Sequence, residues 1–215
     1  MREPQKTLNP EWRQDMSILL KLSVVDMRNF ITDRLAYAIG IEEEEQFLVG
    51  TGVGKPLGLF DTSDAGVDAS RNVSTGNTSG AVKADNLIEV LYNLRPAYLR
   101  GACRWIFHRD VLKQIKKLKT SDGDYLFQID NAGVPRILGV EVIQSEYAPS
   151  TMTAGLRVGI VGDLNHYAIA EYDSSDVLLD PYTDGATNQT RIILTQHTDG
   201  APLLAEAFSV VTLAT

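Results

Sequence analysis

The sequence of 215 residues contains one cysteine, Cys103, and no long apolar run. A single cysteine excludes an intramolecular disulfide framework and a zinc site built from several thiolates. No window approaches the roughly 18 uninterrupted apolar residues of a membrane-spanning helix, and the first residues, MREPQKTLNPEW, lack the apolar core of a secretory signal. We therefore expect synthesis in a reducing compartment, no membrane contact, and a small buried side chain at Cys103.

Positive charge is also scarce. The net charge is −8 and the isoelectric point is about 4.9. A protein that binds DNA or RNA regardless of sequence needs a basic face to release counterions from the phosphates, so the composition argues against that class and leaves only a local basic patch open. The content of 44% hydrophobic and 22% charged residues is ordinary for a globular protein with one large or two small cores.

Helical patterns come first along the chain and strand patterns follow. Apolar residues recur at helical spacing from residue 23 to about 48, which predicts one long helix. Two shorter amphipathic helices are expected around residues 87–94 and 111–118, and the polar residues 61–80 are typical of a loop or linker. Beyond residue 135, β-branched and aromatic stretches predict strands. This order favours an α+β fold.

Residues 49–56, VGTGVGKP, form a glycine cluster that raises the question of a phosphate site. A phosphate-binding loop of the G-x-x-x-x-G-K-S/T type needs a first glycine and a final hydroxyl, where this stretch has Val49 and Pro56. Such a loop also follows a strand, whereas this stretch follows a helical pattern. The residues favour a turn that closes the helix, and a phosphate-dependent enzyme using Gly54 and Lys55 is a distant alternative.

No other motif carries catalytic chemistry. HRD at residues 108–110 lacks the asparagine that a kinase catalytic loop places five residues after its aspartate, because that position is Ile115. We expect a helix start there instead, with Asp110 near the positive end of the helix. The acidic residues of 120–133 lack EF-hand spacing, and the three histidines form no H-x-x-x-H pair. We therefore predict no catalytic, cofactor-binding or metal-binding residue, and no cofactor.

Two charged runs stand out, Glu42–Glu45 and the lysines between residues 113 and 119. A solvated surface is the usual explanation for such runs. Opposite charges on two surfaces of one subunit also suit a protein that associates with itself, because they set the register between copies. The residues thus favour assembly over catalysis.

An ordered series of stretches resembles the major capsid proteins of tailed bacteriophages, the Hong Kong 97 type. The series covers about nine tenths of the chain and consists of SVVDMRNFITDRLAYAIGIEEEEQFLVGTGVGKPLGLF, LYNLRPAYLRGACRWIFHRDVLKQIKKLKTSDGDYLF, GVPRILGVEVIQSEYAPS, VGIVGDLNHYAIAEY and HTDGAPLLAEAFSVV. Each stretch alone is weakly specific, but their order and spacing together are specific.

The resemblance implies a fold and an arrangement of domains. A long spine helix at about 23–48 would belong to a peripheral domain made of residues 1–83 and 169–202, and an axial domain at capsomer centres would comprise 84–168 and 203–215. The glycine cluster would then end the spine helix and bind no nucleotide. The resemblance and the acidic run give a set of candidate residues for subunit interfaces: Asp184, Asn188, Gln189, Arg191, Glu42, Glu43, Glu44 and Glu45.

The family normally carries an extended N-terminal arm and a long E-loop before the spine helix, whereas only about 22 residues precede it here. We expect the arm and most of the E-loop to be missing, with an origin in a phage or prophage.

The resemblance implies a non-enzymatic structural subunit of an icosahedral virion capsid, synthesised in the bacterial cytoplasm. Such subunits form hexamers and pentamers with copies of themselves and enclose DNA without sequence-specific binding. A scaffold, a portal and a maturation protease are possible partners, and an encapsulin-like nanocompartment shell is the alternative.

Overall fold

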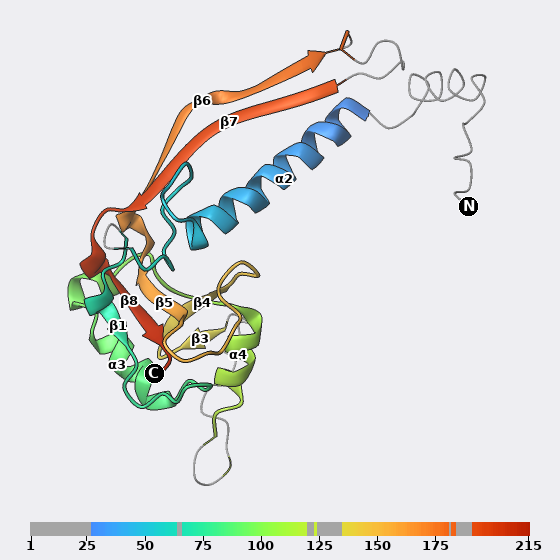
Figure 1. Ribbon diagram of the computed structural model, residues 1–215. Coiled ribbons are helices and arrows are strands. Elements are labelled where there is room, and N and C mark those ends of the chain that lie inside the picture. Colours follow the sequence, from blue (N-terminus) through green and yellow to red (C-terminus); the bar gives the residue numbers. More distant parts are fainter. Residues whose placement is uncertain (1–26, 64–65, 120–122, 124–134, 181, 184–190) are drawn as a thin grey trace, which may run out of the picture. The chain divides into compact units, whose positions relative to one another are not determined.

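The computed structural model describes residues 27–63, 66–119, 123, 135–180, 182–183 and 191–215 (Figure 1). The chain divides into two compact units, residues 1–42 and 43–215. Helix α2, Met27–Val49, begins in the first unit and ends in the second. The long helix expected from periodicity is therefore confirmed over its described length.

The first unit is described only from residue 27, and all of that part is helix. Its side chains are half-buried or exposed where they are described, with Phe30 46% and Tyr37 65% exposed. The Arg34 guanidinium lies 5.3 Å from the centre of the Phe30 ring, a cation–π distance that spans one helical turn. Gly40 is exposed, and a methyl group added there would meet no other atom.

The second unit is built on a six-stranded mixed sheet with the order β1-β8-β5-β2-β4-β3. The strands are β1 (Asn72–Val73), β2 (Cys103–Phe107), β3 (Arg136–Ile137), β4 (Val140–Gln144), β5 (Arg157–Asp163) and β8 (Phe208–Thr212). β1 pairs with β8 and β2 with β4 in parallel, and the other neighbours are antiparallel. Every residue of β5 and β8 is buried, as expected of central strands covered on both faces.

One face of this sheet is covered by two helices, α3 (Ala84–Tyr92) and α4 (Arg109–Lys116). Their apolar stripes pack with alternate residues of the strands, among which Trp105 and Phe107 are fully buried and stack with ring centres 5.4 Å apart. α4 begins where the sequence predicted a helix start, because the His108 ring accepts a hydrogen bond from the backbone N–H of Asp110 at 3.1 Å.

The opposite face is covered by the end of α2 and the chain that follows it. Leu48, Leu59, Phe60 and Val67 pack there against strand residues that alternate with the helix-facing set, including Ile106 and Ile160. Two glycines of β5 permit close packing within the sheet. A methyl group at Gly159 would overlap the Phe107 ring, and one at Gly162 would overlap Phe208.

The described residues of 61–80 are mostly loop, as expected, but they belong to the second unit and do not link two domains, which corrects the expectation of a linker. They contain η1 (Ala69–Arg71) and strand β1, and Val67 is fully buried. The side-chain amide of Asn77 donates to the carbonyl of Thr212 at 2.8 Å, deep in the unit. Most polar residues of this segment face solvent, but a few, such as Asn77, satisfy backbone groups in the core, which composition alone does not reveal.

A long two-stranded ribbon completes the second unit. β6 (Tyr167–Asp180) pairs antiparallel with β7 (Arg191–Pro202), from Tyr167 opposite Pro202 to Asp180 opposite Arg191. The register shifts between Tyr172 and Asp176. Short turns, η3 (Leu164–His166) and η5 (Ala205–Ala207), connect the ribbon to β5 and β8. A mixed sheet with α3 and α4 on one face, together with a separate antiparallel ribbon, confirms the α+β class, although β1 and β2 alternate with the helices along the chain.

Candidate assembly surfaces

The glycine cluster forms a tight turn in which several N–H groups already bind carbonyls of the same chain. The N–H groups of Gly50, Gly52 and Gly58 donate to the carbonyls of Gln46, Pro56 and Gly50. A phosphate-binding loop instead directs free N–H groups towards the ligand. Gly52 and Gly54 have φ values of 73° and 68°, in the left-handed region that glycine adopts without strain. The local geometry therefore fits the predicted helix-closing turn.

The same turn attaches the end of α2 to the base of the ribbon. The N–H of Leu57 donates to the carbonyl of Gly200 at 2.7 Å, and the Tyr167 hydroxyl donates to the carbonyl of Leu57 at 2.9 Å. Burial raises the pKa of Tyr167 to about 12, and the nearby charge of Asp199 adds to the shift. Tyr167 therefore stays a protonated donor across the physiological range.

The acidic run Glu42–Glu45 is partly committed to contacts inside the second unit. The Glu43 carboxylate accepts hydrogen bonds from the Gln196 amide at 2.7 Å and the Thr198 hydroxyl at 3.0 Å. The Glu44 carboxylate accepts one from the Ser145 hydroxyl at 2.6 Å. Helical spacing directs neighbouring residues to different sides, so Glu43 and Glu44 reach different partners. These two contacts position the end of α2, a role that the sequence did not suggest.

The ribbon tip holds the remaining candidates. Asp184, Asn188 and Gln189 lie outside the described residues. Arg191 is the first residue of β7 and stands opposite Asp180 in the register. The neighbouring Tyr182 is 88% exposed. The tip candidates therefore remain predictions.

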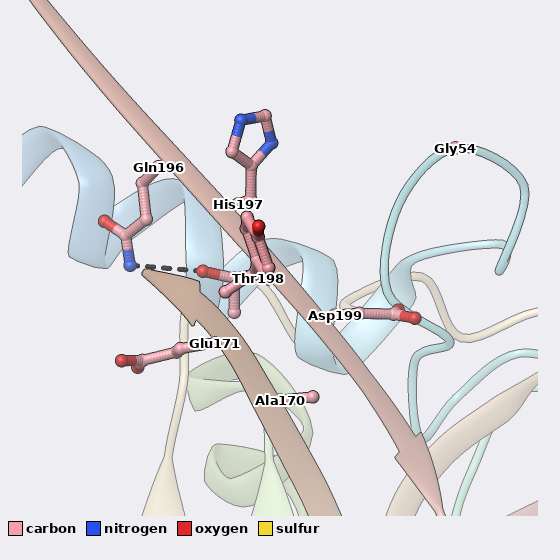
Figure 2. A pocket seen from close by; sticks show the side chains of 8 residues that line it. Gly54, Ala170, Glu171, Gln196, His197, Thr198 and Asp199 are labelled. Atoms are coloured by element: carbon pink, nitrogen blue, oxygen red, sulfur yellow. Dashed lines mark hydrogen bonds between the residues drawn. The ribbon is translucent and has the colours of Figure 1, made fainter. Parts of the chain in front are cut away.

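An open pocket of about 490 Å³ lies beside the base of the ribbon (Figure 2). Its lining residues are Gly54, Ala170, Glu171, Tyr172, Gln196, His197, Thr198 and Asp199. Figure 2 shows Asp199 and Ala170 on the side of the strands nearer to Gly54, with Glu171 and Gln196 on the other side. The two carboxylates therefore do not converge on one point, and the pocket offers a concave acidic surface instead of a coordination site.

The described residues that could carry other chemistry, a cysteine thiol or metal ligands, show no reactive arrangement. Cys103 is 4% exposed, and burial together with the charge of Asp163 raises the pKa of its thiol, so it remains protonated and unreactive. Within the described parts of the chain, no cluster of His, Cys, Asp or Glu side chains could hold a metal ion. Over the same residues, no helix combines the length and apolar character needed to cross a bilayer.

Sequence reasoning missed the buried cation of this unit. Arg157 is 4% exposed, and its guanidinium donates to the carbonyls of Asp61 and Val67, the latter at 2.8 Å. Burial lowers the pKa of Arg157, while the carboxylates of Asp61 and Asp68 oppose that shift. The sequence holds no local signal for this contact, because its partners are 90 or more positions away.

Comparison with known proteins identifies the architecture. The model of the phage capsid family matches residues 17–213. The capsid of an empty GTA particle is 26% identical, with a TM-score of 0.76, and the match covers 92% of this chain and 69% of that chain. No protein in the curated set compared with the chain matches it.

Two more distant structures share the fold. That of Gordonia phage Cozz is 15% identical with a TM-score of 0.59, and the match covers 92% of this chain and 66% of that one. The encapsulin SrpI of Synechococcus elongatus PCC 7942 is 14% identical with a TM-score of 0.63, over 90% of this chain and 69% of its own. The expected Hong Kong 97-type capsid fold is thereby confirmed. Because the family model spans almost the whole sequence, the chain belongs to the phage capsid family.

Proposed function

We propose that this chain is the structural subunit of an icosahedral capsid of the tailed-phage type. In this proposal its copies associate into pentamers and hexamers that enclose DNA. The family match over residues 17–213 carries the proposal. The similarity to a GTA capsid at 26% identity supports it, since that protein also forms a particle. The work of the chain is then symmetric self-association, with no catalytic residue.

The division into domains fits this role. The six-stranded sheet with α3 and α4 belongs to the proposed axial domain, residues 84–168 and 203–215, except for β1, which comes from the proposed peripheral segment 1–83 and moves that boundary towards the N-terminus. The ribbon β6–β7 supplies residues 169–202 of the proposed peripheral domain. Both strands of the ribbon have an open outer edge among the described residues, so the ribbon offers a long surface for contacts between subunits.

The interface candidates belong to the same proposal. Asp184, Asn188, Gln189 and Arg191 remain proposed contacts at the ribbon tip. In the acidic run, Glu43 and Glu44 bind partners in their own chain, and all four glutamates, Glu42 to Glu45, stay proposed contacts with other subunits.

The net charge of −8 suits a container for DNA. A shell of acidic subunits repels phosphates and so limits non-specific adhesion during packaging. Synthesis in the bacterial cytoplasm, followed by assembly with a scaffold, a portal or a maturation protease, belongs to the same proposal.

Negative-stain electron microscopy and light scattering over a concentration series test the proposal. We expect rings of five or six subunits or closed shells, and a nuclease-protected nucleic acid in shells formed in cells. The shared fold with an encapsulin makes a nanocompartment the second candidate, and shells that hold a protein cargo and no nucleic acid would favour it. A monomer at every concentration would contradict both.

Two variants sharpen the experiment. Arg191→Glu reverses a charge at the proposed tip contact and is expected to impair assembly. Lys55→Ala changes an exposed residue of the glycine turn and is expected to assemble normally. If ATP or GTP at millimolar concentration raised the melting temperature by several degrees, the phosphate-dependent alternative would replace the structural one.

A further inference from the structure

The two helices on one face of the six-stranded sheet lie over opposite ends of that sheet. α3 contacts β8 and β1, which end the strand order on one side. α4 follows β2 directly, and its buried side chains share a core with Ile137 of β3 and Val142 of β4, the two strands that end the order on the other side. Any lateral neighbour of this sheet would therefore meet α3 on one flank and α4 on the other.

The outer surfaces of these helices carry opposite charges. Asp85 and Glu89 are exposed on α3 and stand four residues apart. Arg109, Lys113 and Lys117 are exposed along α4 and its C-cap at the same spacing. Residues four apart lie on one side of a helix about 6 Å from each other, so each helix presents a row of one sign.

Within α4 itself, and over the residues that the structure describes, one ion pair compensates the charge of the exposed row only weakly. The one acidic residue of the helix, Asp110, lies 3.5 Å from the Lys113 ammonium, and both side chains are more than 60% exposed. Such a solvated pair interacts weakly and leaves Lys113 available to another partner. The row on α4 is therefore an accessible cationic surface on a chain whose net charge is negative.

Apolar side chains accompany the acidic row. Ile88 is 42% and Tyr92 is 81% exposed, and helical spacing places both on the same side of α3 as Asp85 and Glu89. An aromatic ring beside carboxylates suits lysine and arginine, since the ring covers the aliphatic stem and attracts the cation. The exposed stripe of α3 thus fits the exposed stripe of α4 in chemistry as well as in charge.

The edges of the sheet favour contact through these helices. Both edge strands, β1 and β3, are two residues long. Such short edges offer little backbone for extending the sheet into a neighbouring copy. A contact between two different surfaces of identical subunits closes into a ring when the rotation allows it.

We propose that α3 of one copy packs beside α4 of the next copy around each capsomer axis, and that the two charged rows set the register of this contact. This inference rests on the proposed function and names the two surfaces through which neighbouring copies would meet. Each exposed ion pair is weak, but the ring repeats the contact at every interface. Charged rows of this kind steer association and exclude wrong registers more than they add affinity.

Charge reversal on each helix tests the contact. Lys113→Glu/Lys117→Glu makes α4 acidic, and Asp85→Lys/Glu89→Lys makes α3 basic. Each double variant then opposes like charges at every interface. We expect the concentration needed for ring formation to rise at least tenfold for either one. The quadruple variant restores opposite charges with the signs exchanged, so it is expected to assemble like the unmodified protein.

A mixture of the two double variants gives a sharper readout. One double variant has two acidic helix surfaces and the other has two basic ones. In an equimolar mixture, opposite charges therefore meet only where the two different variants are neighbours, so they must alternate around the ring. Alternation requires an even number of subunits. We therefore expect the mixture to form hexamers and no pentamers, as counted in class averages from electron microscopy.

Controls separate this inference from the proposed function. Lys55→Glu/Arg100→Glu makes the same change in net charge outside both helices and is expected to assemble normally, and circular dichroism checks the folding of each variant. If the unmodified protein assembles and the double variants do so equally well, or the folded quadruple variant stays dispersed, the helix contact is wrong while the proposed function stands. If the unmodified protein forms no ring, the proposed function fails and takes the contact with it.

Discussion

Glu43 accepts a hydrogen bond from the hydroxyl of Thr198, 155 positions away in the sequence, at 3.0 Å. The contact joins the last turns of α2 to strand β7, and the Gln196 amide donates to the same carboxylate oxygen. The base of the ribbon is therefore attached to the end of the long helix by a charge-assisted pair of hydrogen bonds, which are stronger than neutral ones.

Replacing Glu43 should weaken this attachment. We expect Glu43→Ala to lower the free energy of unfolding by about 1–3 kcal/mol, since hydrogen bonds to a charged group are lost. Glu45→Ala, two residues further along the same helix, should change it by no more than about 0.5 kcal/mol. Urea denaturation measures both values, and equal effects would show that the Glu43 contacts contribute nothing.

The buried guanidinium of Arg157 should be more sensitive. Arg157→Met keeps much of the side-chain volume but leaves the carbonyls of Asp61 and Val67 without their donors. We expect a loss of about 2 kcal/mol or more, because each buried carbonyl left unpaired costs about 1–3 kcal/mol. The exposed Arg100 provides the matched control, and Arg100→Met should be nearly neutral. A mild effect of Arg157→Met would mean that water replaces the guanidinium.

Two glycine-to-alanine changes should have opposite signs. Gly159→Ala places a methyl group into the Phe107 ring, so it is expected to destabilise the sheet by about 1–3 kcal/mol as an overpacked core does. Gly40→Ala adds a methyl group to an open helical position and should stabilise α2 by about 0.5–1 kcal/mol. Circular dichroism during thermal melting compares the stabilities of the two variants with that of the unmodified protein. Destabilisation by Gly40→Ala would indicate that its surface is covered.

Alkaline pH should release the Tyr167 contact. Its pKa is raised from 10.0 to about 12 in the folded protein, so folding favours the protonated phenol. The corresponding stability is fully present below pH 10 and is lost as the pH rises through about 12. Titration of tyrosinate absorbance should show one late-ionising residue, which Tyr167→Phe removes. If the number of late-ionising tyrosines is the same in both proteins, the Tyr167 hydroxyl is not buried against the carbonyl of Leu57.

Much of the fold follows from local sequence patterns. The spacing of Val111, Leu112 and Ile115 predicted an amphipathic helix, and these side chains are buried under α4. His108 and Asp110 marked its start, which the capping hydrogen bond confirms. Cys103 was expected to be small and buried, and it is. Such features depend on neighbours within a few residues, so a single sequence contains them.

Features that depend on distant partners could not be predicted in this way. Residues 61–80 look like a linker because their polar side chains give no sign of partners such as Thr212 or Arg157. The burial of Arg157 and the pairing of Glu43 with β7 depend on which strands become neighbours. Strand order is set by packing of the whole sheet, and period-2 patterns do not encode it.

The candidate surfaces also combine features that are visible in the sequence with features that only the fold reveals. The acidic run and the lysines of α4 are visible in the sequence as runs. The acidic row of α3 is less visible, because Asp85 and Glu89 are separated by three uncharged residues and align only on a helix. Only the fold shows that the rows on α3 and α4 lie over opposite ends of one sheet.

Cryo-electron microscopy of the assembled protein is the decisive measurement. We expect closed shells or rings with five or six copies, in which the six-stranded sheets surround each axis and α3 of one copy faces α4 of the next. A protein that remains monomeric at every concentration, in the presence or absence of DNA, would contradict the claim that this chain is the subunit of a shell.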